Sequence, residues 1–118
     1  MEMDKYTRKS LEVVEKAKEK ALEYDNQELT QMHLLAGLLE IDGVNVTGAV
    51  NAVEDKLARL PKVSGGNMYA GNNFSKALIQ AEKEAKQMGD TYVSVEHLFL
   101  GMVDKADSDI KECLKGWG

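Results

Sequence analysis

The segment YVSVEHLFLGMV at residues 92–103 decides the fold, because it repeats the segment ELTQMHLLAGLL at residues 28–39 without a gap. In each copy a serine or threonine is followed by a histidine three positions later and by a glycine seven positions later. Ser94 and Thr30 are good N-cap residues, so the pattern predicts two helices that begin in the same way. An apolar residue before each cap, and a leucine five positions after that residue, have the spacing of a hydrophobic staple.

Two longer amphipathic helices show the same offset of 64 residues. We predict them at residues 6–24 and 73–88, because each segment carries an apolar stripe at helical spacing. The matched stripes are Tyr6, Ser10, Val13, Val14, Ala17, Ala21 and Tyr24 in the first, and Ala70, Phe74, Ala77, Leu78, Ala81, Ala85 and Met88 in the second. Alanines allow helices to approach closely, so one expected arrangement packs the two long helices on each other about a pseudo-twofold axis.

The two short helices, at about residues 30–40 and 94–104, carry too many apolar side chains for an exposed helix. We therefore assign to the core Leu34, Leu35, Leu38 and Leu39 of the first, and Leu98, Phe99, Met102 and Val103 of the second.

A further helix is predicted at residues 46–60, where Pro61 ends it. Its stripe consists of Val46, Val50, Val53, Leu57 and Leu60. Residues 62–72 contain three glycines and are predicted to form a flexible link, with Asn72 or Asn73 capping the next helix. The last predicted helix, at residues 107–115, places on one side Ile110, Cys113 and Leu114.

The length of 118 residues suits one compact domain and is too short for two ordinary ones. The composition is 43% hydrophobic with a single proline, which is typical of a helical globular protein. We therefore predict an all-α fold in which two pseudo-repeated helical motifs form one compact domain. Repeat one covers about residues 1–61, the link about 62–72 and repeat two about 73–118.

The net charge of −5, from 20 acidic and 15 basic residues, argues against nucleic-acid binding, which needs a basic surface. The sequence contains no apolar run long enough to span a membrane and no export leader, so we expect no membrane partner and a cytoplasmic location. The single Cys113 excludes an internal disulfide.

Catalysis has little support in the sequence. His33 and His97 are candidate bases or metal ligands, but their place three residues after a cap predicts that they hydrogen-bond to the cap and pack beneath the turn. A hydrolase or metal enzyme would need both histidines to converge with Glu96 in one pocket. Cys113 has no histidine nearby in the sequence and is better explained as a buried structural thiol than as a nucleophile. We predict no catalytic residue, no metal site and no cofactor.

Taken together, the doubled pattern, SVEHL at residues 94–98 and LARLPKV at 57–63 resemble the N-terminal domain of the Clp AAA+ ATPases. The ClpB-type disaggregases are the most similar branch, through MDKYT at residues 3–7, DNQE at 25–28 and GDTYVS at 89–94. The resemblance covers nearly the whole chain. It implies a fold of two four-helix repeats.

This chain departs from that pattern twice. Between Ile41 and Val46 there are too few residues for the third helix, and after Gly118 nothing supplies the last one. By resemblance, residues 107–115 are the third helix of repeat two. The 64-residue offset gives another alignment, in which Ile110, Leu114 and Trp117 match Val46, Val50 and Val53. No G-x-x-x-x-G-K-[ST] phosphate loop is present, so this chain is not expected to be the ATPase itself.

The resemblance implies a non-catalytic N-terminal module that binds unfolded or aggregated polypeptide for a protein disaggregase of the stress response. The ATPase modules of the parent chain would then do the mechanical work. Thr7, Asp90 and Glu96 correspond to polar positions that ClpB-type domains use in substrate handling. Leu78 and Tyr92 are apolar neighbours expected to line an adjacent groove.

The alternative is an N-terminal domain of a protease-associated Clp ATPase, which binds adaptor proteins or phosphoarginine. Those domains use an acidic residue before the histidine in both repeats, whereas here the first copy has Met32 and only the second has an acid, Glu96. Loss of one of two carboxylates weakens the case for a guanidinium ligand. Adaptor docking would use a charged patch, whereas client binding would use an apolar groove.

Overall fold

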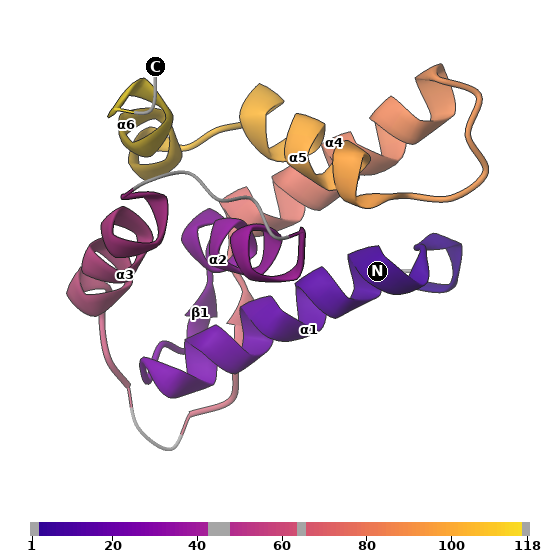
Figure 1. The fold of residues 1–118 in the computed structure, drawn as a ribbon. Helices are drawn as coiled ribbons and strands as arrows, with labels where there is room; N and C mark the ends of the chain where they lie inside the picture. Colours follow the sequence, from indigo (N-terminus) through magenta and orange to yellow (C-terminus); the bar gives the residue numbers. More distant parts are fainter. Residues whose placement is uncertain (1–2, 43–47, 64–65, 117–118) are drawn as a thin grey trace.

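The computed structural model describes residues 3–42, 48–63 and 66–116, and within these ranges the chain is all-α, as predicted. The helices are α1 (Arg8–Glu23), α2 (Gln31–Asp42), α3 (Ala49–Arg59), α4 (Asn72–Gln87), α5 (Val95–Asp104) and α6 (Ser108–Gly116). A 3-10 turn at Met3–Lys5 precedes them, and two short strands, β1 (Glu28–Leu29) and β2 (Tyr69–Ala70), lie between them. Figure 1 shows α2 in the middle of the molecule, with the other helices around it.

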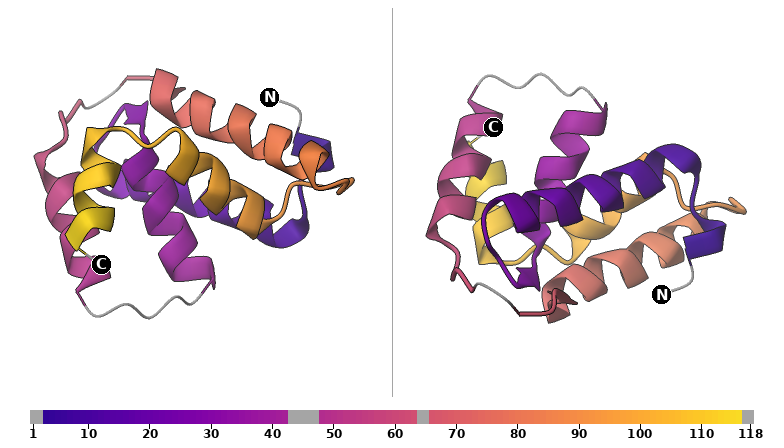
Figure 2. Two further views of the ribbon diagram at one scale, coloured as in Figure 1. Left: turned by 90° about the horizontal axis from the view of Figure 1, so that it is seen from above. Right: turned by 90° about the horizontal axis from the view of Figure 1, so that it is seen from below.

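Each long helix packs on the short helix of its own repeat, α1 on α2 and α4 on α5 (Figure 2). The expected packing of the long helices on each other is therefore wrong. The reason lies in the glycine of each short helix, because a Cβ at Gly37 would lie 2.5 Å from the carbonyl oxygen of Val13. A Cβ at Gly101 would likewise collide with the carbonyl oxygen of Ala77. The two glycines let the backbones within each repeat approach closely.

Two equivalent parallel pairings of short extended segments join the two repeats. Strand β1 pairs in parallel with β2, and Leu29 is opposite Ala70. An isolated parallel bridge joins Tyr6 to Val93, and these two residues are the 64-residue counterparts of Ala70 and Leu29. The segment before each long helix thus pairs with the segment before the short helix of the other repeat. This paired exchange, here called the clasp, follows the pseudo-twofold relation that the repeat predicts.

Residues next to the clasp also form hydrogen bonds with part of the predicted link at residues 62–72. The amide of Tyr69 donates to the carbonyl of Gln27 at 3.0 Å, and Gln27 Nε2 donates to the carbonyl of Asn67 at 2.9 Å. Residues 64–65 lie outside the described residues.

The cap of α4 is Gly71, and not Asn72 or Asn73 as expected. The amide of Gly71 donates to the carbonyl of Leu29 at 2.8 Å, and a Cβ here would lie 2.8 Å from that same oxygen. The crossing with β1 therefore requires glycine at the cap. At α3 the predicted stop is confirmed, because the helix ends at Arg59 and Leu60 is extended before Pro61.

The core is centred on α2, in which the four predicted leucines are all buried. In α5, Leu98 and Met102 are buried, but the prediction was wrong for Phe99 and Val103, which are exposed. Helix α3 covers α2, whereas α6 packs on α3 and α2 and leaves the outer face of α5 open.

The predicted stripes of α3 and α4 differ from the structure in detail. Val50 is exposed, and α3 instead buries Ala49 with Val53 and Leu57. Val46 lies outside the described residues. Ala70 and Met88, at the two ends of the second long stripe, are exposed, and both lie outside α4.

One buried polar side chain that sequence reasoning missed forms hydrogen bonds to three other segments. Gln31 is completely buried, and its Nε2 donates to the carbonyls of Asn73 at 2.9 Å and Lys105 at 2.8 Å. Its Oε1 accepts from the amide of Asp107 at 2.9 Å. Gln31 therefore links α2 to the start of α4, the end of α5 and the start of α6.

Helix α6 forms as predicted, with Ile110 and Cys113 buried and Leu114 half-buried. Lys56 of α3 joins it through ion pairs to Glu112 at 2.9 Å and Asp109 at 3.6 Å. Trp117 lies outside the described residues.

Candidate functional site

The histidine of each short helix closes its own cap, as the sequence predicted. The backbone amide of Ser94 donates to Nδ1 of His97 at 2.9 Å, and the amide of Thr30 donates to Nδ1 of His33 at the same distance. Because Nδ1 accepts in both rings, the hydrogen-bond network places the proton of each neutral imidazole on Nε2. Both histidines are buried. They are structural parts of the cap.

The other ring nitrogen binds a residue of the preceding turn, and of these two turn residues the sequence analysis singled out Asp90 but not Asn26. Nε2 of His33 donates to Oδ1 of Asn26, and Nε2 of His97 donates to Oδ2 of Asp90, each at 2.9 Å. Asn26 and Asp90 lie at equivalent positions of the two repeats, 64 residues apart. This equivalence is the feature of the sequence from which the pair could have been identified. Burial lowers the pKa of His33 to about 4.

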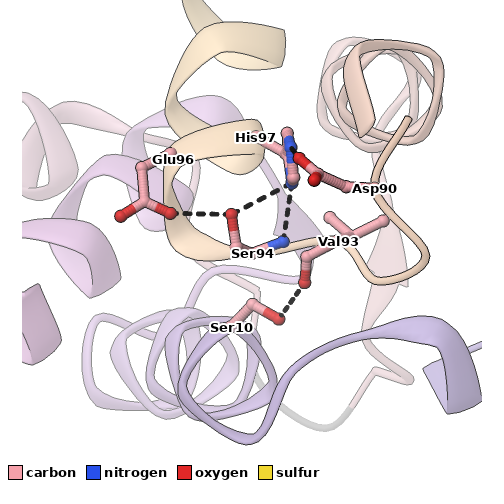
Figure 3. Close-up of polar contacts among 6 residues, drawn as sticks. All are labelled: Ser10, Asp90, Val93, Ser94, Glu96 and His97. Atoms are coloured by element: carbon pink, nitrogen blue, oxygen red, sulfur yellow. Dashed lines mark hydrogen bonds and ion pairs between the residues drawn. The ribbon is translucent and has the colours of Figure 1, made fainter. Parts of the chain in front are cut away.

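The clasp brings the N-terminal segment against the cap of α5. The amide of Thr7 donates to the carbonyl of Val93 at 2.9 Å. The hydroxyl of Ser10 donates to the same oxygen at 2.8 Å (Figure 3). Thr7 is also the N-cap of α1, where its Oγ1 accepts from the amide of Ser10 at 3.2 Å. The segments that carry the predicted site residues Thr7, Asp90, Tyr92 and Glu96 are thus joined by hydrogen bonds, and we call these joined segments the frame. We call these four residues the Tyr92 patch.

Glu96 is exposed at the start of α5, on the opposite side of Ser94 from Asp90 (Figure 3). Its Oε2 accepts from the hydroxyl of Ser94 at 2.7 Å. This hydrogen bond, its own backbone amide and the nearby charge of Lys9 lower the pKa of Glu96. The carboxylate is therefore charged at neutral pH, and the helix N-terminus favours that charge.

The apolar members of the predicted site are placed differently. Tyr92 exposes 54% of its surface. Leu78 is completely buried in the core on the inner side of α4. Leu78 is therefore not available to line a groove without repacking of the core, because it belongs to the stripe on which α5 packs.

One buried polar atom near the patch is unsatisfied. The hydroxyl of Tyr6 has no hydrogen-bond partner within the described residues, and the Tyr6 side chain is buried beside the clasp. Burial, and then the charge of Glu82, raise the pKa of Tyr6 to about 12. The phenol therefore remains neutral.

The enzyme hypothesis gains no support from the geometry. His33 and His97 are used by separate caps, so they do not converge on Glu96. Among residues 3–42, 48–63 and 66–116, no three histidine, cysteine or acidic side chains are grouped to hold a metal ion. Burial raises the pKa of Cys113, which disfavours a thiolate nucleophile. None of the described helices is both long and apolar enough to cross a bilayer.

Comparison with known proteins adds an independent finding. The profile of the Clp repeat (R) N-terminal domain matches residues 5–117. The chaperone protein ClpB of Clostridium tetani is 31% identical over 97% of this chain and 15% of its own length. ClpB of Rhodopseudomonas palustris is 30% identical over 100% of this chain and 15% of its own. This chain thus spans about 15% of the length of these curated relatives.

Solved structures show the same fold. The N-terminal domain of Hsp104 from Candida albicans superposes with a TM-score of 0.82 at 21% identity, covering 98% of this chain and 83% of that one. The N-terminal domain of ClpD, a caseinolytic protease associated chaperone from Arabidopsis thaliana, gives a TM-score of 0.77 at 17% identity. That match covers 97% of this chain and 87% of the ClpD domain.

Proposed function

This chain belongs to the Clp repeat (R) N-terminal domain family, and from that premise we propose that it binds unfolded or aggregated polypeptide for a ClpB-type disaggregase. The domain itself is a non-ATPase module of a chaperone. The ATPase modules of the parent protein would supply the mechanical work, in the cytoplasm.

The observation that carries the proposal is the exposure of Tyr92 on a fixed frame. Its backbone neighbour Val93 is hydrogen-bonded to the N-terminal segment on both sides, through the amide of Thr7 and the carbonyl of Lys5. An aromatic side chain next to a hydrogen-bonded backbone segment offers apolar contact area at little cost in backbone conformational entropy. The exposed carboxylates of Asp90 and Glu96 in the same patch favour basic side chains of a client. The patch therefore suits stretches of unfolded chain that combine apolar and basic residues.

The affinity expected from so small a patch is weak. A few apolar side chains are buried, and the ordering of a flexible client opposes binding, so the dissociation constant should be on the order of micromolar to millimolar. Weak binding suits a module that passes clients on.

The structure does not favour the phosphoarginine alternative. The residue before the histidine in repeat one, Met32, lacks a carboxylate and is also buried. A ligand at that position would have neither a charge partner nor access.

Fluorescence anisotropy of a labelled, permanently unfolded polypeptide would test the proposal. Tyr92→Ala should weaken binding about fivefold to tenfold, because an exposed aromatic contact is removed while the frame is kept. Ile79→Ala is the matched control, since Ile79 is similarly exposed but lies on α4 away from the patch. Equal effects of the two substitutions, or binding of a native adaptor in preference to the unfolded chain, would contradict the proposal.

A further inference from the structure

The hydroxyl of Thr7 forms its hydrogen bonds inside the frame. Its Oγ1 donates to Oγ of Ser10 at 3.0 Å and accepts from the amide of Ser10 at 3.2 Å. Ser10 is completely buried, and its own hydroxyl proton has two carbonyl oxygens within reach, that of Val93 at 2.8 Å and that of Thr7 at 2.9 Å. The shorter bond, to Val93, joins the two repeats. The one proton of the Thr7 hydroxyl is therefore directed to Ser10 and not to a client.

A series of hydrogen bonds continues from Ser10 to Asp90. The carbonyl of Val93, which accepts from Ser10, belongs to the same peptide group as the amide of Ser94. That amide donates to Nδ1 of His97 at 2.9 Å (Figure 3). Nε2 of His97 donates to Oδ2 of Asp90, also at 2.9 Å. Each intermediate group accepts at one end and donates at the other, so each bond polarises the next. We call this series, from the Thr7 hydroxyl to the carboxylate, the Asp90 relay.

Repeat one closes its cap without the two hydroxyls and the carboxylate of the relay. Gly71 and Phe74 stand at the positions of the two hydroxyl residues, and Asn26 stands at that of the carboxylate. His33 nevertheless accepts from the amide before its helix and donates to Asn26, each at 2.9 Å. Closing a cap therefore does not require the hydroxyls. They occur in the repeat that carries most of the Tyr92 patch.

We propose that Thr7 and Ser10 are positioning residues, which act through the Asp90 relay to fix the carboxylate of Asp90 for a basic side chain of the client. One carboxylate oxygen is bound to His97, while 52% of the Asp90 side chain remains exposed. A carboxylate that is already ordered loses less conformational entropy when a lysine or arginine binds to it. The inference rests on the proposed function. It assigns to the Thr7 hydroxyl a role other than direct contact with the client.

A double-mutant cycle in client affinity separates positioning from contact. The readout is the dissociation constant of the labelled, permanently unfolded polypeptide. Thr7→Val and Ser10→Ala should each weaken binding about threefold, and the double variant should also weaken it about threefold, because both changes break one relay. If the Thr7 hydroxyl contacted the client, the two effects would multiply to about ninefold. Thr7→Ser, which keeps the hydroxyl, should restore the affinity that Thr7→Val loses.

Asp90→Asn provides a second cycle, because an amide at this position can still accept a hydrogen bond but carries no charge. In this background Ser10→Ala should have no further effect on affinity, since no carboxylate remains to be positioned. This cycle does not depend on Thr7→Val, which also removes the side-chain cap of α1. The control is Thr30→Val, the same substitution before α2, which should leave client affinity unchanged.

The ring ¹⁵N signals of His97 test the relay without a client. Ser10→Ala should move them, because the peptide group that donates to Nδ1 loses a donor at its oxygen, and it should leave those of His33 unchanged. Unmoved His97 signals, or effects that multiply in either cycle, would overturn the inference. If Tyr92→Ala still weakened binding, the proposed function would stand and only this inference would fail. A wild-type chain that bound no client would contradict both.

Discussion

At the scale of single residues, the two caps differ in the side chain that Nε2 of the histidine contacts. His33 faces the neutral amide of Asn26, whereas His97 faces the carboxylate of Asp90. Nδ1 of His33 accepts from a backbone amide, so a proton added there would displace that bond. Geometry and burial both favour the neutral ring, in agreement with its lowered pKa.

Stability should therefore fall in acid partly through His33. The pKa of an unperturbed histidine is about 6.5, and that of folded His33 is about 4. Between these values the unfolded chain binds a proton that the folded chain does not, so the free energy of unfolding decreases as pH falls. The total loss from this residue is roughly 3 kcal/mol, complete near pH 4, with no further change from His33 above about pH 6.5.

The variant Asn26→Asp isolates this contribution, because it gives His33 the partner that His97 has. The added carboxylate should raise the pKa of His33 and flatten the acid-induced loss. The variant also loses the hydrogen bond from Asn26 Nδ2 to the carbonyl of Pro61, so total stability is not the readout. The pKa of His33, followed through its ring protons by NMR, is the measurement. A wild-type His33 that titrates near 6.5 would refute the account.

At the scale of elements, the contact between each long helix and its short helix depends on a glycine. Replacing glycine by alanine inside a helix ordinarily stabilises it by up to about 1 kcal/mol. At Gly101 the new Cβ would collide with the carbonyl of Ala77 and lie 2.6 Å from the amide nitrogen of Ala81, so the helices must separate. We expect Gly101→Ala to cost about 1–3 kcal/mol.

Gly37→Ala should be destabilising for the same reason, since its Cβ would meet the backbone of Val13. Denaturant unfolding of both variants, with the exposed substitution Leu100→Ala as a control, checks the sign. Unchanged or increased stability of the glycine variants would show that α1–α2 and α4–α5 are not closely packed.

The helices themselves were predictable from the sequence, whereas their outer contacts were not. Apolar spacing located all six helices to within a few residues, and the caps at Thr30 and Ser94 followed from their residue types. Phe99 and Leu35 have equivalent positions and similar apolarity, so their different burial depends on where α3 and α6 pack. The glycine cap at Gly71 and the bonds of Gln31 likewise arise from contacts between distant segments, which local periodicity does not contain.

At the scale of the whole molecule, the clasp makes the Tyr92 patch a product of both repeats. Thr7 precedes the first long helix and Tyr92 precedes the second short helix. The bridge between Tyr6 and Val93, together with the hydrogen bond from the Ser10 hydroxyl to the carbonyl of Val93, brings these two segments together. The resemblance to Clp N-terminal domains selected Thr7, Asp90, Tyr92 and Glu96, which the structure carries on one frame. It also selected Leu78, whose burial depends on the packing of α4 against α5.

The central claim is that this patch binds unfolded polypeptide mainly through apolar contact, and its most direct test is an NMR titration at two salt concentrations. The labelled chain is titrated with a permanently unfolded protein at low and at high salt. Salt screens exposed charge pairs but affects apolar burial little. We predict shifts at Asp90, Tyr92 and Glu96 that persist in high salt. Shifts that disappear in high salt, or no shifts up to millimolar client, would contradict the claim.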